Sequence, residues 1–144
     1  MDTKGTFYFY FSFNFTGGNK MASIRMDKQI FPFFDSVKTP ITAAGISDSF
    51  HNAGFSIITI EVTGDEVEGV VEGCINIVKP DGTTKTDDEC EWMSLALIDL
   101  KDYSVYTKIP GEGHYCIGIN GMARVRVNLT SISGESTIVG VAEA

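Results

Sequence analysis

The chain has few basic residues, few cysteines and no long apolar run. Lys and Arg number 11 against 19 Asp and Glu, which gives a formal net charge of −8. Nucleic acid and anionic membrane are therefore excluded as direct partners, because both would repel so acidic a surface. The three cysteines are an odd count without close pairing, which indicates neither a disulfide framework nor a zinc knuckle. No run of about 18 apolar residues occurs, so no membrane-spanning helix is predicted.

The chain also lacks the usual signatures of catalysis and metal binding. The motif G-x-S-x-G is absent, so the isolated His51 has no nucleophile at a recognisable spacing. His114 and Cys116 project on one side of an expected strand, but no second pair completes the four ligands of a zinc site. The acidic clusters in 61–72 and 87–91 do not have the spacing of a calcium loop and are interpreted as solvated. We expect no enzymatic activity, no metal and no cofactor.

The chain does contain a succession of short segments in which apolar and polar residues alternate. The segments are 54–62, 67–78, 90–99, 103–109, 114–119, 123–129 and 135–142. Turn residues separate them, such as Thr63-Gly64-Asp65 and Ser133-Gly134. Since no segment shows the 3.6-residue period of a helix, the prediction is an all-β fold. The expected form is an antiparallel β-sandwich or jelly roll of about seven to eight strands over 54–144, with an extended N-terminal arm.

The turn at Asn120-Gly121 predicts which side chains face outward. A three-residue loop over 120–122 would pair Ile117 with Val125 and make one face of the hairpin wholly apolar. The opposite face would then hold the polar residues His114, Cys116, Arg124, Arg126 and Asn128. This face is the part of the acidic chain with the most cationic character.

The N-terminus carries an aromatic alternation over 7–15 that would promote aggregation if it were exposed. One interpretation is that translation begins at Met21, because a purine run resembling a bacterial ribosome-binding site can encode Gly17-Gly18-Asn19-Lys20. Residues 1–20 would then be an upstream extension that is not part of the native protein. The alternative is an edge strand docked on a sheet or on a neighbouring subunit.

Residues 21–53 lack periodicity and are predicted to form an extended arm with aromatic anchors. The interface residues that we expect are Phe31, Phe33, Phe34, Arg124 and Arg126. The three rings would dock on a neighbouring subunit, since aromatic anchors dominate such interfaces. The two arginines would meet acidic residues of an adjacent copy, such as Glu68 and Glu72.

The order of strands and turns over 54–64, 71–75, 92–96, 98–100, 113–119, 125–134 and 137–141, preceded by 34–37 and 39–42, carries a likeness to a known family. Through these segments most of the chain from Met21 onward resembles the small β-sandwich structural proteins encoded in the virion modules of tailed bacteriophages, and 34–37 and 39–42 are similar to the arms of those proteins. The resemblance implies a non-enzymatic capsid decoration or head-fibre anchoring domain, or a tail component. It implies a homo-oligomer, with a trimer as one arrangement, that binds capsid or tail subunits. Such a protein would be assembled in the bacterial host cytoplasm and reside in the virion.

One stretch departs from that family and supports an alternative function. Residues 79–91 are longer and more acidic than a simple hairpin loop. Together with Trp92, Tyr103 and Tyr106 as a stacking platform, this loop would suit a carbohydrate-binding module or a receptor-binding tail component. Trp92 would otherwise contribute to the core.

Overall fold

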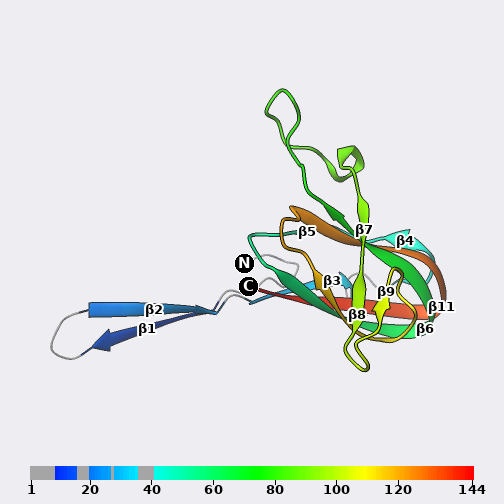
Figure 1. The fold of residues 1–144 in the computed structure, drawn as a ribbon, viewed down its shortest axis with the longest axis horizontal. Coiled ribbons are helices and arrows are strands. Elements are labelled where there is room, and N and C mark those ends of the chain that lie inside the picture. Colours follow the sequence, from blue (N-terminus) through cyan, green and yellow to red (C-terminus); the bar gives the residue numbers. More distant parts are fainter. Residues whose placement is uncertain (1–8, 16–19, 27, 36–40) are drawn as a thin grey trace.

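The computed structural model describes residues 9–15, 20–26, 28–35 and 41–144 (Figure 1). In this part of the chain an antiparallel sheet of nine strands has the order β3-β11-β6-β10-β8-β9, with β4 and β5 beside β11 and β7 beside β6. The strands are β3 (Lys28–Phe34), β4 (Gly45–Ile46), β5 (Phe50–His51), β6 (Ile57–Cys74), β7 (Met93–Leu95), β8 (Leu97–Asp99), β9 (Val105–Tyr106), β10 (Gly113–Gly118) and β11 (Arg124–Glu143). The predicted all-β class is confirmed. Within the described ranges, no helix has the length and apolarity that a membrane span requires.

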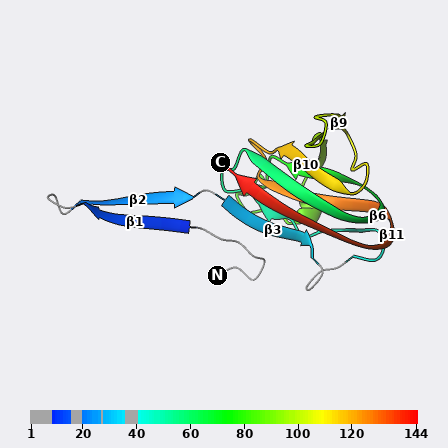
Figure 2. The same ribbon diagram turned by 90° about the horizontal axis from the view of Figure 1, so that it is seen from below.

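Two long strands, β6 and β11, pair with each other through most of the sheet (Figure 2). The first half of β6 has β10 on its other edge, and the second half has β7 there. In the same way, the first half of β11 lies beside β4 and β5, whereas its second half lies beside β3. One hydrogen-bonded sheet therefore has two halves that share the same pair of strands. The sandwich or jelly-roll form stays a prediction.

The predicted turns at Thr63-Gly64-Asp65 and Ser133-Gly134 are in fact irregularities inside the continuous strands β6 and β11. The register between these strands shifts at three places from Leu129 to Thr137. The backbone angle φ is positive at Gly64 (123°), Glu66 (49°) and Gly134 (88°). Glycine tolerates such angles, so each strand changes direction locally and then resumes pairing.

One core cluster takes side chains from both halves of the sheet. In the first half of β6 the even-numbered residues Ile58, Ile60 and Val62 are buried, as the alternation over 54–62 predicts. Beyond the irregularity the odd-numbered Val67 and Val71 are buried instead. This change of parity is the effect of a bulge, which turns later side chains of the strand to the other face.

Residues 28–34, predicted as part of an extended arm, form the edge strand β3 of the main sheet. Phe31, Phe33 and Phe34 are 4%, 2% and 5% exposed. The ring of Phe31 packs edge-to-face on Phe33 at a centroid distance of 5.0 Å and on Phe50 at 5.5 Å. The rings therefore lie in the core of their own chain, which corrects the expectation that they are exposed anchors.

Strands β1 (Phe9–Phe15) and β2 (Lys20–Met26) form a separate two-stranded antiparallel sheet (Figure 2). Their register runs from Phe9 opposite Met26 to Phe15 opposite Lys20. Residues 1–8 and 16–19 of the predicted N-terminal extension lie outside the described residues. The start of translation at Met21 stays a prediction.

The predicted hairpin between 114–119 and 123–129 is wrong. Strand β10 pairs with β6 and β8, so Ile117 lies opposite Ile58. Strand β11 pairs with the other end of β6, which places Val125 opposite Gly73. The intervening turn crosses between the two halves, and the amide of Asn52 holds it by donating to the carbonyls of Ile119 and Met122 at 3.2 and 3.0 Å.

Candidate functional site

A row of directly opposed residues crosses the outer face of the sheet, away from the core, through six strands. We call this row the apolar stripe; it consists of Ile30, Val141, Thr59, Cys116, Ile98 and Val105, in order across the sheet. Since neighbouring strands lie about 4.8 Å apart, the stripe is about 24 Å long. Ile30, Ile98 and Val105 are 38%, 39% and 67% exposed. Val141, Thr59 and Cys116 between them are half-buried. Apolar side chains gathered on an outer face are typical of a protein interaction site.

Further apolar residues extend the stripe, and polar pairs border it. Ile57, two residues before Thr59, and Leu100, two residues after Ile98, are exposed beside it. On one side Lys28 Nζ lies 3.3 Å from Glu143 Oε1, and on the other His114 Nε2 lies 3.4 Å from Glu61 Oε2. Lys28 and Glu143 are oppositely charged, whereas His114 and Glu61 form an ion pair only when the imidazole is protonated. The six residues of the stripe are all uncharged, on a chain of net charge −8.

Cys116 lies in the middle of the stripe and is half-buried. Burial raises the pKa of its thiol, while a hydrogen bond with Thr59 acts in the opposite direction. The thiol is therefore mostly protonated at neutral pH and behaves as a small apolar side chain. An open pocket of about 460 Å³ adjoins this region at Leu100 and His114.

Arg124, one of the two predicted interface cations, is buried within its own chain. Its side chain is 6% exposed, and Nη1 donates to Asp87 Oδ1 at 2.9 Å. The same oxygen accepts a hydrogen bond from Ser49 Oγ at 3.0 Å. Asp87 begins the short 3-10 turn η1 (Asp87–Glu89), which covers this end of the sheet. Arg124 therefore holds the loop of its own chain to the sheet, and its side chain is not available to another subunit.

The second predicted cation, Arg126, is also used within the chain. Arg126 Nε donates to Glu72 Oε1 at 2.9 Å across the β6–β11 ladder. Its guanidinium carbon lies 4.0 Å from the centroid of the Trp92 ring, a cation–π contact. The indole N–H of Trp92 donates to the carbonyl of Asp87 at 2.8 Å. The expected pairing of arginine with Glu72 thus occurs, but inside one chain rather than between copies.

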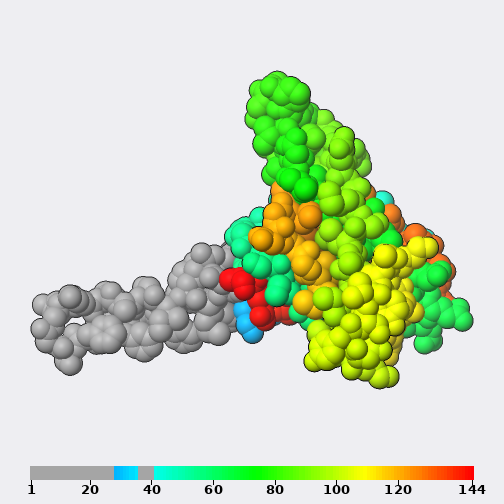
Figure 3. All heavy atoms as spheres, in the orientation of Figure 1, coloured from blue at the N-terminus to red at the C-terminus, as the bar shows by residue number. Residues whose placement is uncertain are grey.

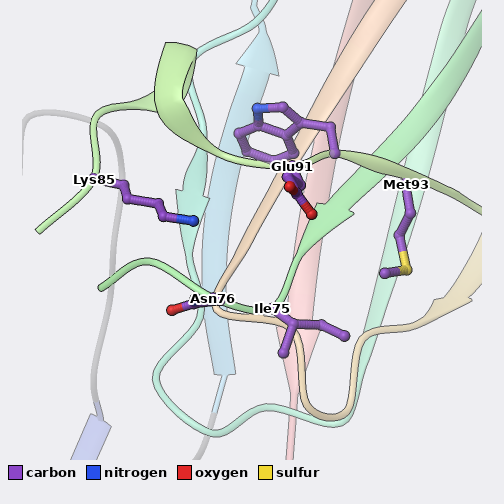
Figure 4. Close-up of a pocket in the computed structure, with 6 residues that line it drawn as sticks. Ile75, Asn76, Lys85, Glu91 and Met93 are labelled. Atoms are coloured by element: carbon purple, nitrogen blue, oxygen red, sulfur yellow. The ribbon is translucent and has the colours of Figure 1, made fainter. Parts of the chain in front are cut away.

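Trp92 also borders an open pocket of about 370 Å³ (Figure 4). The residues that line it are Ile75, Asn76, Lys85, Glu91, Trp92 and Met93. Lys85 and Glu91 supply one basic and one acidic group from the same loop. The other two aromatic residues of the predicted stacking platform, Tyr103 and Tyr106, do not line this pocket. Tyr106 lies opposite Leu97, which is about 16 Å along extended chain from Trp92.

The predicted acidic stretch 79–91 projects from the body of the protein (Figure 3). An ion pair of 2.7 Å joins Lys79 Nζ to Glu89 Oε2. Lys79, together with the amide and hydroxyl of Thr86, lowers the pKa of Glu89 to about 2. Across the described ranges, no three His, Cys, Asp or Glu side chains cluster closely enough to hold a metal ion.

Comparisons with known proteins find a shared fold. No protein-family model matches the chain, and no curated protein matches its sequence. The SPBc2 prophage-derived protein YomS has a similar structure, with a TM-score of 0.64 and 18% identity over 82% of this chain and 94% of YomS. The PBSX exported protein XepA is also similar, with a TM-score of 0.68 and 16% identity over 100% of this chain but 47% of XepA. The chain therefore has the fold of YomS and of about half of XepA, two phage-related proteins.

Proposed function

We propose that the chain is a non-enzymatic virion structural protein of a tailed bacteriophage, which decorates the capsid or anchors a head fibre. The shared fold with a prophage-derived protein and with the PBSX protein XepA supports a phage-related role. In this proposal the protein is assembled in the bacterial host cytoplasm and then resides in the virion. It acts by binding copies of itself and capsid or tail subunits.

The observation that carries this proposal is the apolar stripe. A protein interface typically has an apolar centre and a polar rim, and the stripe has both, with Lys28–Glu143 on one border and His114–Glu61 on the other. Two copies of an acidic chain repel each other, so they meet most favourably where few charges lie. The stripe is such a region, because its six residues are uncharged. Self-association through the stripe is thus the expected contact.

Charge introduced into the stripe tests the proposal. We expect the double variant Ile98→Glu, Val105→Glu to lower the oligomer mass, measured by size-exclusion light scattering, to the 15.7 kDa of one chain. In a contact between two copies, the variant would bury four carboxylates. The free energy of removing them from water would far exceed the free energy that the apolar contact contributes. The matched control is Ile46→Glu, Val78→Glu, because both residues are 53% exposed and lie outside the stripe.

The control should keep the wild-type mass and the same circular dichroism spectrum. A wild-type protein that is monomeric at every concentration, or a stripe variant that keeps the wild-type mass, would contradict self-association through this face. Binding of each variant to purified phage particles extends the test to capsid and tail subunits. Loss of particle binding by the stripe variant alone is the expected result.

A second candidate function is carbohydrate or receptor binding, which the pocket beside Trp92 favours. An indole, an ammonium and a carboxylate together suit a sugar, since the ring stacks on its apolar face while the charged groups bind hydroxyls. This function predicts glycan-array binding that Trp92→Ala abolishes without loss of fold. Tyr103→Ala serves as the control because Tyr103 is exposed and lies outside the pocket.

A further inference from the structure

The loop 75–89 leaves the sheet after Cys74, the last residue of β6, and is followed by Cys90, three residues before the chain rejoins the sheet at β7 (Figure 1). Within the loop, Val78 and Thr84 form an isolated bridge, and Lys85 N donates to the Ile77 carbonyl at 2.7 Å. The loop thus folds back on itself. A cysteine flanks it at each end, Cys74 in β6 and Cys90 before β7.

Cys74 and Cys90 both lie next to Arg124. Cys74 is directly opposite Arg124 in the β6–β11 ladder, so both side chains lie on the same face of the sheet. From this face Arg124 Nη1 donates to Cys90 Sγ at 3.5 Å. Cys74 is 1% exposed, whereas Cys90 is half-buried.

The Cys90 thiol lies near enough to Cys74 to affect its ionisation. Burial, and then the neighbouring Cys90 thiol, raise the pKa of the Cys74 thiol. The Cys74 thiol itself donates to the carbonyl of Asn76 at 3.4 Å. Arg124 therefore has Cys74 opposite it in the ladder and the Cys90 sulfur against its guanidinium, and both thiols are free in the structure.

We propose that Cys74 and Cys90 are an oxidation site, where a small-molecule disulfide converts two thiols into one intramolecular disulfide that joins both ends of the 75–89 loop. The half-buried Cys90 attacks first as a thiolate, forming a mixed disulfide and releasing one small thiolate. Cys74, after losing its proton, attacks the Cys90 sulfur and releases the second. The protein loses two electrons and two protons; the small disulfide gains both electrons and becomes two thiols.

This disulfide would stiffen the pocket beside Trp92. One wall, Ile75 and Asn76, directly follows Cys74, and the opposite wall, Glu91 to Met93, directly follows Cys90 (Figure 4). The bond would fix the separation of the two walls at their base. Closing a loop of about 15 residues removes enough entropy from the unfolded chain to raise the melting temperature by roughly 10 °C. The inference stands independently of the proposed virion role.

The test uses the full chain with Cys116→Ser, a substitution on β10 that leaves the two cysteines as the only thiols. The folded protein is equilibrated with oxidised glutathione, alkylated and digested with trypsin. Trypsin cuts after Lys85, between the two cysteines, so their peptides stay together only if they are linked. We expect the linked pair, an intact mass about 2 Da lower and a higher melting temperature, all reversed by a thiol reductant.

Cys90→Ser and Cys74→Ser complete the test in the same background. Cys90→Ser should keep the Cys74 thiol unmodified because the reagent does not reach it, and Cys74→Ser should keep glutathione on Cys90 because nothing resolves the adduct. Free thiols after equilibration of the Cys116→Ser protein, or a lasting glutathione adduct on its Cys90, would overturn the proposal. Neither result requires the serine variants to fold.

Discussion

The carboxylate of Asp87 compensates the buried positive charge of Arg124. The substitution Asp87→Ala would remove this carboxylate and leave the charge buried. Loss of one partner from a buried ion pair costs about 3–5 kcal/mol, because the remaining charge is left without compensation. The Arg124 side chain is 6% exposed, but the Asp87 side chain is 38% exposed, so water already screens part of this interaction. We therefore expect a loss of about 2–3 kcal/mol in the free energy of unfolding.

Urea denaturation followed by tryptophan fluorescence measures this loss, because Trp92 donates to the Asp87 carbonyl beside the pair. Asp88→Ala is the matched control, since Asp88 is the next residue of η1 and is exposed. The control should change the free energy of unfolding by less than about 0.5 kcal/mol. Equal effects of the two substitutions would refute the conclusion that Asp87 holds Arg124. The double variant Asp87→Ala, Arg124→Met should recover most of the loss, because it leaves no buried charge.

Two further predictions concern the loop and β3. The pKa of Glu89, about 2 in the folded chain, lies below its ordinary value of 4.5, so the Lys79 contact stabilises the loop fully above pH 4.5 and is lost as the pH falls through 2. An NMR titration of the Glu89 carboxyl should have its midpoint near 2, and a midpoint near 4.5 would contradict the contact. Phe33→Ala should lower the free energy of unfolding by about 3–5 kcal/mol in urea, because the ring is buried. Ile30→Ala, on the outer face of the same strand, is its control and should cost about 1 kcal/mol; similar losses in both would place Phe33 outside the core.

Local alternation in the sequence predicts which face of a strand is buried, but not where a strand ends. The buried positions Ile58 and Ile60 follow directly from the period of two over 54–62. Gly64 and Gly134 were predicted to end strands, yet β6 and β11 continue through both. A glycine with positive φ suits both a turn and a bulge, and the presence of a partner strand on the far side decides between them.

The candidate interface residues show even more clearly that local sequence does not predict which distant segments pack together. Aromatic side chains and arginines are suited to interfaces, but they serve equally well inside one chain. Phe33 packs into the chain's own core, and Arg126 pairs with Glu72 of the same chain. Both outcomes depend on pairing partners distant in sequence, β3 with β11 and β6 with β11. No local window of sequence contains that information.

The sequence by itself determined the all-β class and the inward or outward direction of individual side chains, because these depend on a period of two within each strand. Only the tertiary structure decided which outward side chains stand together. The apolar stripe joins residues as distant as Ile30 and Val141, and the cysteine pair joins Cys74 to Cys90 across a projecting loop. Each depends on long-range pairing in the sheet, which packing of the whole core selects rather than the preference of any single segment.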